Sequence, residues 1–491
     1  MMRHREKLIF EHGSPGRTGA SLPPAEVPEA EPADVWPANV RRGTEPRLPE
    51  VSEVEVTRHF TRLSQWNFFI DAGLYPLGSC TMKYNPKINE RVARLAEFAS
   101  IHPYRPQAEM QGSLEVMWRL ERALCEIGGF ERVTLQPAAG AHGELCGLML
   151  IVAYHRDRGR RPSKVLIPDS AHGTNPASVS LNHLKVVTLP TGEDGLLHAD
   201  TVRAACDDDV AALMLTNPST LGLFEENVAE IAEIVHARGG LVYMDGANFN
   251  ALMGKLRPGE TGVDVMHFNL HKTFTTPHGG GGPGSGPVGV RQALVPFLPT
   301  PTVEREGERF RLEFNRPKSV GRLRSFYGNF GMHVRAYTYI REMGAAGLTR
   351  ATELAVLNAN YLRARLKDTY HLPYDRLCMH EVVLSDKTLK RDTGVQTLDV
   401  AKRLMDHGFH PPTIYFPLVV PGALMIEPTE TETPETLDEF VAAMRSIADE
   451  ARRDPERVKS APHEVGMRRL DEARAARNPK LRWRPQGESE G

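Results

Sequence analysis

The feature that most constrains the fold is a regular alternation of strand-like and helix-like segments between residues 113 and 330. Helical patterns cover residues 113–127, 143–157, 202–206 and 228–238. Short apolar runs with the pattern of buried strands lie at 133–136, 164–168, 185–189, 210–215, 241–245 and 263–267. Strands that alternate with helices form mostly parallel sheets whose two faces are both covered. The sequence therefore predicts a large α/β domain over residues 113–330.

The pattern changes on either side of this region, and further domain boundaries follow. Longer helices at 332–343, 351–370 and 437–452, with short strands near 381–384 and 423–427, predict a smaller α+β domain over residues 331–455. Residues 1–112 are predicted to hold a Pro/Ala/Glu-rich arm at 13–50, a helix starting near Val51 and an active-site loop at 73–86. Residues 456–491 are highly charged and are predicted to form a tail.

Composition excludes several classes of function. The 491 residues include 60 Lys and Arg and 62 Asp and Glu, and the net charge of -2 does not favour nucleic acid or a membrane as partner. The longest apolar stretch, residues 148–154, is too short to span a bilayer. Five scattered cysteines without C-x-x-C spacing argue against a structural zinc site or a disulfide framework. We therefore expect a soluble, cytoplasmic protein with no metal site.

The most informative segment is NLHKTFTTPHGGGGPG at residues 269–284. Lys272 follows a predicted strand and precedes a glycine run, which allows backbone to approach closely. Enzymes that use pyridoxal phosphate (PLP) need such a lysine, because its amine forms an imine with the cofactor aldehyde and is later released as a base. Taken alone, the segment is also compatible with a surface lysine beside a flexible loop.

Asp245 ends the predicted strand 241–245, with one further predicted strand between it and Lys272. A strand-end Asp of a parallel sheet points into the crevice where ligands bind. In PLP enzymes such a carboxylate keeps the pyridine nitrogen protonated, so that the ring can accept electrons. The alternative is an ordinary strand-end turn. The pairing of this Asp with the later Lys is typical of fold-type I, aminotransferase-like PLP enzymes, and that is the fold we predict.

Segments after other strands complete the predicted cofactor site. Gly140 and Ala141 open a helix, where free N–H groups bind phosphate. His172 is predicted to stack on the pyridine ring and is the third catalytic residue beside Lys272 and Asp245. Thr220 can offer its hydroxyl to the phosphate or to the cofactor O3′, and His271 is included because it precedes Lys272. Small residues in tight turns and lone histidines are also common without any ligand.

A polar loop, PLGSCTMKYNP at residues 76–86, precedes the predicted sheet. We predict that it contacts the substrate, although an ordinary surface loop is the alternative. No neighbouring base that would make Cys80 a nucleophile is evident. The predicted substrate-loop residues are Ser79, Cys80, Thr81, Lys83 and Asn85.

Together these segments resemble the P protein of the glycine cleavage system, a family of PLP-dependent glycine decarboxylases. The resemblance extends from about residue 7 to about residue 452. The family exists as one long chain or as two related subunits in bacteria, and the length and Lys272 resemble the second of these subunits. The motifs that carry the match are GSCTMK (78–83), AGAHGE (139–144), AHGTNP (171–176), DGAN (245–248), NLHKTF (269–274) and GRLRSFYGN (321–329).

The resemblance implies decarboxylation of glycine, release of CO2 and transfer of the aminomethyl group to the oxidised lipoyl arm of H protein. It also implies an obligate partner, the homologous P protein subunit 1, in a heterotetramer of two copies of each. An aminotransferase or a desulfurase would use the same Asp and Lys but would need neither the 78–83 loop nor a lipoyl partner. A catalytically silent scaffold subunit is disfavoured by the presence of both Lys272 and Asp245. The spacing of His267, His271 and His278 is not that of a zinc site.

Overall fold

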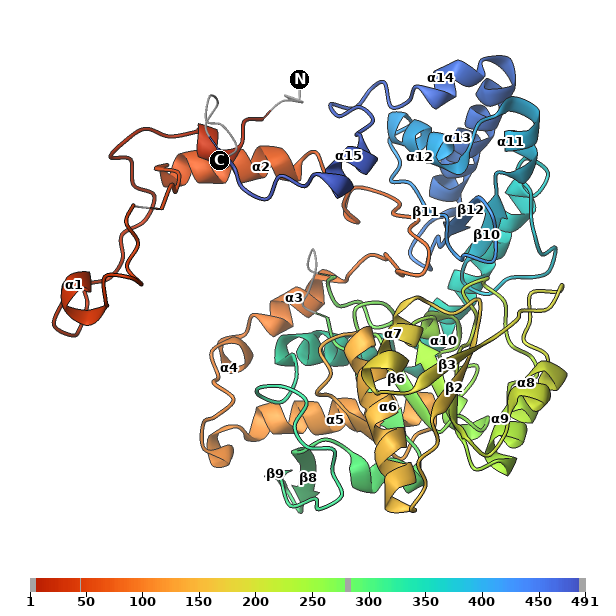
Figure 1. The fold of residues 1–491 in the computed structure, drawn as a ribbon, viewed down its shortest axis with the longest axis horizontal. Helices are drawn as coiled ribbons and strands as arrows, with labels where there is room; N and C mark the ends of the chain where they lie inside the picture. Colours follow the sequence, from red (N-terminus) through yellow and green to blue (C-terminus); the bar gives the residue numbers. More distant parts are fainter. Residues whose placement is uncertain (1–5, 45, 279–283, 485–491) are drawn as a thin grey trace. The chain divides into compact units, whose positions relative to one another are not determined.

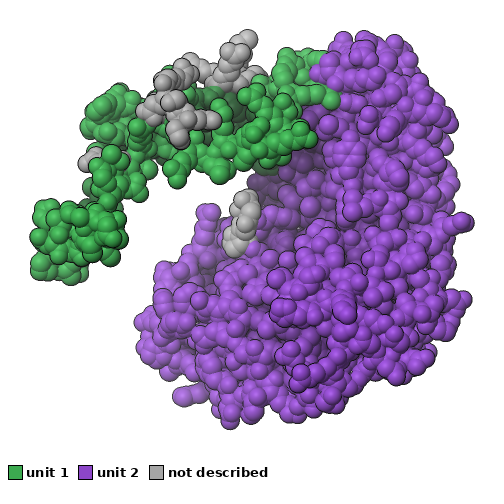
Figure 2. Space-filling view, viewed as in Figure 1, with its two compact units in different colours: residues 1–69, 461–491 green, residues 70–460 purple. Residues whose placement is uncertain are grey.

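The computed structural model describes residues 6–44, 46–278 and 284–484. The chain divides into two compact units, one of residues 70–460 and one of residues 1–69 with 461–491 (Figure 2). The larger unit contains both regions that the sequence predicts as separate domains. Each of these two regions has a sheet of its own.

The main sheet of the larger unit has seven strands in the order β1-β7-β6-β5-β4-β2-β3 (Figure 1). Neighbouring strands from β6 to β3 pair in parallel, whereas β7 is antiparallel to both β1 and β6. The predicted, mostly parallel sheet is therefore confirmed, and the sequence pattern missed only β7. The strands are β1 (Arg132–Thr134), β2 (Lys164–Pro168), β3 (Lys185–Leu189), β4 (Val210–Thr216), β5 (Leu241–Gly246), β6 (Val265–Phe268) and β7 (Val288–Val290).

Helices cover both faces of this sheet, which explains why β4 and β5 are buried at every position. Along β4, Leu213 packs in a cluster with residues of α5 and α9, and Met214 packs in another with residues of α6 and α7. Figure 1 shows α6 and α7 side by side, in agreement with their contacts. The helices of this region are α5 (Gln111–Gly128), α6 (Gly140–Asp157), α7 (Thr174–Leu181), α8 (Ala199–Ala205) and α9 (Val228–Ala237).

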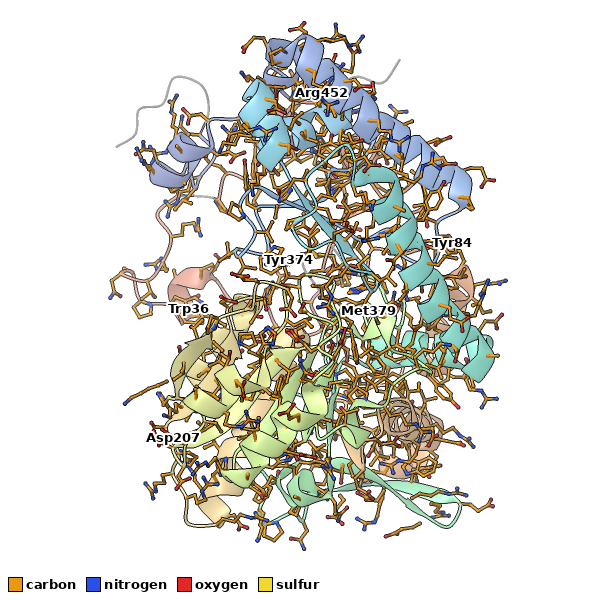
Figure 3. The ribbon with its side chains drawn as sticks, turned by 90° about the vertical axis from the view of Figure 1, so that its right-hand side faces the viewer. Trp36, Tyr84, Asp207, Tyr374, Met379 and Arg452 are labelled. Atoms are coloured by element: carbon orange, nitrogen blue, oxygen red, sulfur yellow. The ribbon has the colours of Figure 1, made fainter. Side chains whose placement is uncertain are left out.

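The C-terminal region of the larger unit is an α+β layer around an antiparallel sheet, β10-β12-β11. The helices predicted at 332–343 and 351–370 are the two parts of α10, which is interrupted at Gly344, where φ is 60° and the backbone is not helical. Tyr374 and Met379 lie where this region meets the main-sheet region (Figure 3), and the Met379 N–H donates to Gly222 O at 2.7 Å. The elements are α10 (Phe330–Leu366), β10 (Val382–Ser385), α11 (Lys387–Thr393), α12 (Thr397–Asp406), β11 (Thr413–Ile414), β12 (Ala423–Ile426), α13 (Pro434–Arg453) and α14 (Pro455–Lys459).

The remaining elements are the helices of the smaller unit, and two helices and a hairpin of the larger unit. In the smaller unit, the helix predicted near Val51 is α2, and Ser52 and Glu55 form a capping box at its start. The arm of the smaller unit is exposed from residue 13 to residue 44. Among the described residues, no helix has both the length and the apolar composition needed to cross a membrane. These elements are α1 (Pro32–Val35), α2 (Glu53–Ser64) and α15 (Glu472–Arg477) in the smaller unit, and α3 (Lys87–Ala93), α4 (Ala96–Ala99), β8 (Thr302–Glu306) and β9 (Arg309–Glu313) in the larger.

Candidate active site

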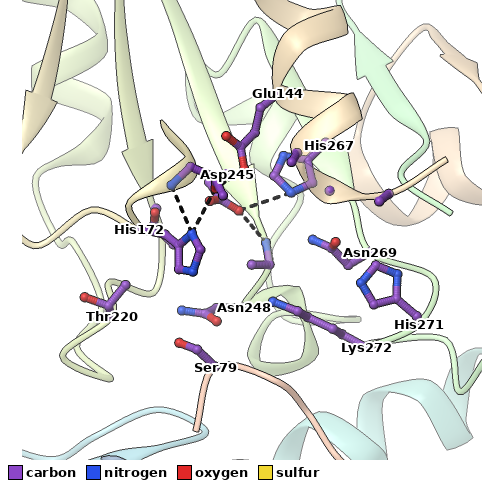
Figure 4. A pocket seen from close by; sticks show the side chains of 16 residues that line it. Ser79, Glu144, His172, Thr220, Asp245, Asn248, His267, Asn269, His271 and Lys272 are labelled. Carbon is purple, nitrogen blue, oxygen red and sulfur yellow. Dashed lines mark hydrogen bonds and ion pairs between the residues drawn. The ribbon is translucent and has the colours of Figure 1, made fainter. Parts of the chain in front are cut away.

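A cavity of about 250 Å³ lies at the carboxyl ends of the main-sheet strands, where parallel sheets bind ligands (Figure 4). Its wall is formed by segments that follow β1, β2, β4, β5 and β6, and by one residue from the polar loop. Figure 4 shows the Lys272 side chain pointing into the cavity, between Asp245 on one side and Ser79 on the other. The predicted residues that line the cavity are Ser79, Gly140, Ala141, His172, Thr220, Asp245, His271 and Lys272.

Strand register brings three polar residues into one row at this edge of the sheet. Thr216 on β4 pairs with Asp245 on β5, and Asp245 pairs with His267 on β6. His267 Nε2 lies 3.2 Å from Asp245 Oδ1, and Nδ1 of the same ring lies 2.7 Å from the Tyr243 hydroxyl. The Asn175 amide donates to Asp245 Oδ2 at 3.1 Å. Asp245 is thus held from several sides at the bottom of the cavity.

The surroundings of Asp245 favour its ionised form. Burial alone would raise the pKa of Asp245, but the interaction with His267, the Asn175 hydrogen bond and the charge of Lys272 outweigh burial and lower it. Burial raises the pKa of Tyr243 well above its ordinary value, so its hydroxyl stays protonated and can donate to His267 Nδ1. The other ring nitrogen of His267, Nε2, faces the Asp245 carboxylate.

Lys272 lies in the turn directly after β6, where its N–H donates to Asn269 O at 3.0 Å. Burial and the charge of Lys272 lower the pKa of the adjacent His271 to about 3, so this imidazole is neutral. Residues 279–283 of the predicted glycine run lie outside the described residues. A Cβ at the following Gly284 would come within 2.8 Å of His271 Nδ1, so only glycine fits there without a shift.

The turn before α6 has the features of an anion site. The helix begins at Gly140, and the first N–H groups of an α-helix have no partner within the helix. A Cβ at Gly140 would lie 2.5 Å from Asn269 Oδ1, which accounts for glycine at this position. Three cavity residues have buried side-chain atoms with no hydrogen-bond partner among the described residues, namely Thr216 Oγ1, Asn269 Nδ2 and His271 Nδ1. A polar ligand such as PLP would satisfy them.

His172 lies at the rim of the cavity and is exposed. Its Nδ1 is 2.8 Å from Thr174 Oγ1, which donates to Glu144 Oε1 at 2.7 Å. Sequence reasoning missed these two partners, although Glu144 lies inside the motif that opens α6. The other cavity residues that it missed are Ala139, Thr216, Ala247, Asn248, His267 and Asn269. A histidine in an otherwise apolar strand, as at His267, was the available signal.

Most of the predicted substrate loop lies outside the cavity wall. Of that set only Ser79 lines the cavity, and Cys80, Thr81, Lys83 and Asn85 do not. Burial raises the pKa of the Cys80 thiol, which disfavours a nucleophilic role. Lys83 is buried, and its Nζ donates to Asn250 Oδ1 at 2.8 Å, Thr273 O at 2.8 Å and Glu430 Oε1 at 2.7 Å. All three donors of Lys83 are therefore used within the protein.

Comparison with known families and sequences gives a consistent assignment. The family model described as "Glycine dehydrogenase, C-terminal domain" matches residues 351–465, and "Aminotransferase class-V" matches residues 151–282. A "Probable glycine dehydrogenase (decarboxylating) subunit 2" of Caldanaerobacter subterraneus subsp. tengcongensis is 57% identical over 98% of this chain and 100% of its own length. The protein of the same name from Halalkalibacterium halodurans is 58% identical over 98% of this chain and 99% of its own.

Solved structures share the predicted fold-type I architecture. A glycine decarboxylase (P-protein) of the glycine cleavage system, in inhibitor-bound form, matches with a TM-score of 0.69 and 21% identity, covering 84% of this chain and 93% of that one. A cysteine desulfurase from Thermococcus onnurineus NA1 matches with a TM-score of 0.59 and 16% identity, covering 77% and 95%. At these identities the structures establish the fold, and the relatives of nearly equal length establish the family. The chain belongs to the glycine dehydrogenase (decarboxylating) subunit 2 family.

Proposed function

We propose that this chain is the PLP-carrying subunit of a glycine decarboxylase, which releases CO2 from glycine and passes the aminomethyl group to the oxidised lipoyl arm of H protein. The observation that carries the proposal is the identity of 57% across 98% of the chain to a glycine dehydrogenase (decarboxylating) subunit 2. The cavity adds support, because Lys272 and Asp245 both line it.

We assign PLP to this cavity. The N–H groups of Gly140 and Ala141 would hold its phosphate. Thr220, whose hydroxyl donates to Ser170 O, would offer its oxygen to the cofactor as an acceptor. Lys272 would bind the aldehyde carbon. His172 would cover one face of the ring, and His271 would contact the cofactor next to the lysine. When bound, PLP supplies the electron sink for the pair left on the glycine α-carbon as CO2 departs.

Asp245 would hold the proton on the pyridine nitrogen. Among the described residues, its Oδ2 accepts one hydrogen bond, from Asn175, and so retains a lone pair for the ring N–H. Asp245 can do this because its lowered pKa keeps it ionised. Tyr243 and His267 act through Asp245 as positioning residues, since they fix one oxygen of the carboxylate and leave the other for the cofactor.

An aminotransferase or a desulfurase remains the alternative for a fold of this type. Solved desulfurases share the fold at 16% identity, and this degree of similarity carries no information on the substrate. The full-length relatives at 57–58% identity favour the glycine reaction instead.

We also propose that the protein is cytoplasmic. All five cysteines are free, which agrees with a reducing compartment.

We also propose that the chain works as a heterotetramer with the homologous P protein subunit 1. The relatives are named "subunit 2", which implies a second kind of subunit. The arm of the smaller unit supports a partner, because it exposes apolar side chains that its own core does not cover. Leu22 is 92% exposed and Trp36 is 60% exposed. Such a segment is more readily ordered by a neighbouring chain than by itself.

The test is to express the chain alone and together with the candidate first subunit. We expect light scattering to give the mass of a tetramer with two copies of each subunit. We also expect glycine-dependent CO2 exchange, measured with lipoylated H protein, to rise strongly when the first subunit is present. A homodimer with full exchange activity and no gain from the first subunit would refute the heterotetramer.

A further inference from the structure

Two glutamates outside the cavity wall form a buried acidic pair in the C-terminal region. The side chains of Glu381, Glu427 and the adjacent His380 are fully buried, and one ligand-type atom of each lies within 4.8 Å of the others. Oε1 of each glutamate and both ring nitrogens of His380 have no hydrogen-bond partner among the described residues. So many unpaired polar atoms in one buried place indicate a role beyond packing.

The two glutamates contact the polar loop directly. Glu381 Oε2 accepts the Ser79 N–H at 2.8 Å, and Glu427 Oε2 accepts the Thr81 N–H at 2.9 Å. Both loop residues have left-handed backbone, with φ of 59° at Ser79 and 48° at Thr81. Residues other than glycine rarely adopt this conformation unless the surroundings hold them there. The acidic pair therefore holds the loop in the conformation that places Ser79 at the cavity wall.

The charges around the pair indicate that it keeps a proton near neutral pH. Burial raises the pKa of Glu427 to about 7, and burial together with Glu427 raises the pKa of Glu381 well above its ordinary value. The charge of Lys272 acts to lower the pKa of both glutamates, and Glu430 acts to raise the pKa of Glu427.

The remaining groups near the pair do not neutralise it. Burial and Lys272 lower the pKa of His380 to about 3, so the imidazole is neutral. Burial raises the pKa of Cys80, so its thiol carries no charge, and Lys83 is paired with Glu430. Two carboxylates this close and this deeply buried cannot both be charged at low cost, so at least one of them keeps its proton.

We propose that Glu381 and Glu427 are positioning residues for the glycine site: by accepting the Ser79 and Thr81 N–H groups, they fix the loop at residues 79–81 so that Ser79 closes the cavity around a small substrate. This inference rests on the proposed function. Because the raised pKa of an acid favours the protonated form in the folded state, the arrangement is stable at low pH. It weakens as pH rises through about 7, where Glu427 loses its proton.

The test compares Glu427→Ala with Glu427→Gln in the PLP-loaded chain assembled with its first subunit. Glutamine keeps an oxygen that can accept the Thr81 N–H but cannot titrate. Glycine binding is followed by the absorbance of the bound cofactor. It is measured at about pH 6.5 and about pH 8.5, which lie on either side of the Glu427 pKa of about 7. Hydrogen exchange of the peptide covering residues 76–84 reports on the loop itself.

We expect Glu427→Ala to weaken glycine binding at the lower pH by about tenfold or more, which is the effect of losing a hydrogen bond to an acidic group. The same variant should speed amide hydrogen exchange at residues 79–81. Glu427→Gln should bind glycine within about twofold of wild type at that pH, because its acceptor oxygen remains. Its affinity should also fall less than that of wild type at the higher pH.

The matched control is Glu225→Ala, because Glu225 is another buried carboxyl that accepts a backbone N–H, from Leu197 at 2.9 Å, yet does not line the cavity. This variant should leave glycine affinity unchanged.

Unaltered binding in Glu427→Ala, or a wild-type pH dependence in Glu427→Gln, would overturn the inference. If Glu427→Ala does not fold, the pH dependence of Glu427→Gln decides. A wild-type complex that shows no spectral response to glycine would instead refute the proposed function, and hydrogen exchange would still test the loop.

Discussion

Lys272→Ala is expected to abolish glycine decarboxylation and the absorbance band of the lysine-bound cofactor. Exchange of CO2 with glycine should fall by at least about 10⁴-fold, the upper end for loss of a general acid or base, because the lysine also carries the cofactor. Lys272 is the lysine that lines the cavity, and its side chain points into it (Figure 4). An absorption spectrum and an exchange assay of the purified complex measure both effects.

A second experiment identifies the lysine that carries the cofactor in the wild-type protein. The protein is reduced with borohydride, digested and analysed by mass spectrometry. The pyridoxyl group should be found on Lys272. Lys83 and Lys255 serve as internal controls, because Lys83 donates to three protein oxygens and Lys255 forms an ion pair with Glu353. An adduct on either of these two lysines would show that the cofactor assignment is wrong.

Asp245→Asn is expected to retain PLP but to lose most activity. A neutral amide cannot hold the proton on the ring nitrogen, so the ring becomes a weaker electron sink. The loss should be about 10²–10³-fold in turnover, similar to the removal of one oxyanion-hole donor at about 2.7–4 kcal/mol. The measurements are cofactor content by absorbance and the rate of CO2 exchange.

His267→Gln offers a graded comparison for Asp245→Asn. Glutamine can still donate one hydrogen bond to Asp245 Oδ1, although the link to the Tyr243 hydroxyl is lost. Its turnover should therefore lie between those of wild type and Asp245→Asn. Near-normal turnover in Asp245→Asn would refute the role of the carboxylate, whatever the result for His267→Gln.

Residues at strand ends could be predicted from the sequence because chain order and the parallel fold place them at one edge. Asp245 lies one residue before the end of β5, Lys272 follows β6 and Gly140 opens α6, and all three line the cavity. Parallel sheets gather such positions in the same crevice, so no knowledge of side-chain contacts was needed. The fold class followed from the same alternation of elements.

The residues that support these positions could not be predicted, because they depend on register and on distant contacts. His267 meets Asp245 through the pairing of β5 with β6, and the sequence does not specify that register. Glu381 and Glu427 reach the polar loop across more than 300 residues of chain, at separations of 302 and 346.

The most direct test of the central claim is the fate of carboxyl-labelled glycine in the complete complex with lipoylated H protein. We expect label to leave the glycine carboxyl group and to equilibrate with dissolved CO2. This exchange should require both the lipoylated protein and Lys272, and no glyoxylate should accumulate. Formation of glyoxylate with the carboxyl label retained would instead identify an aminotransferase and contradict the account.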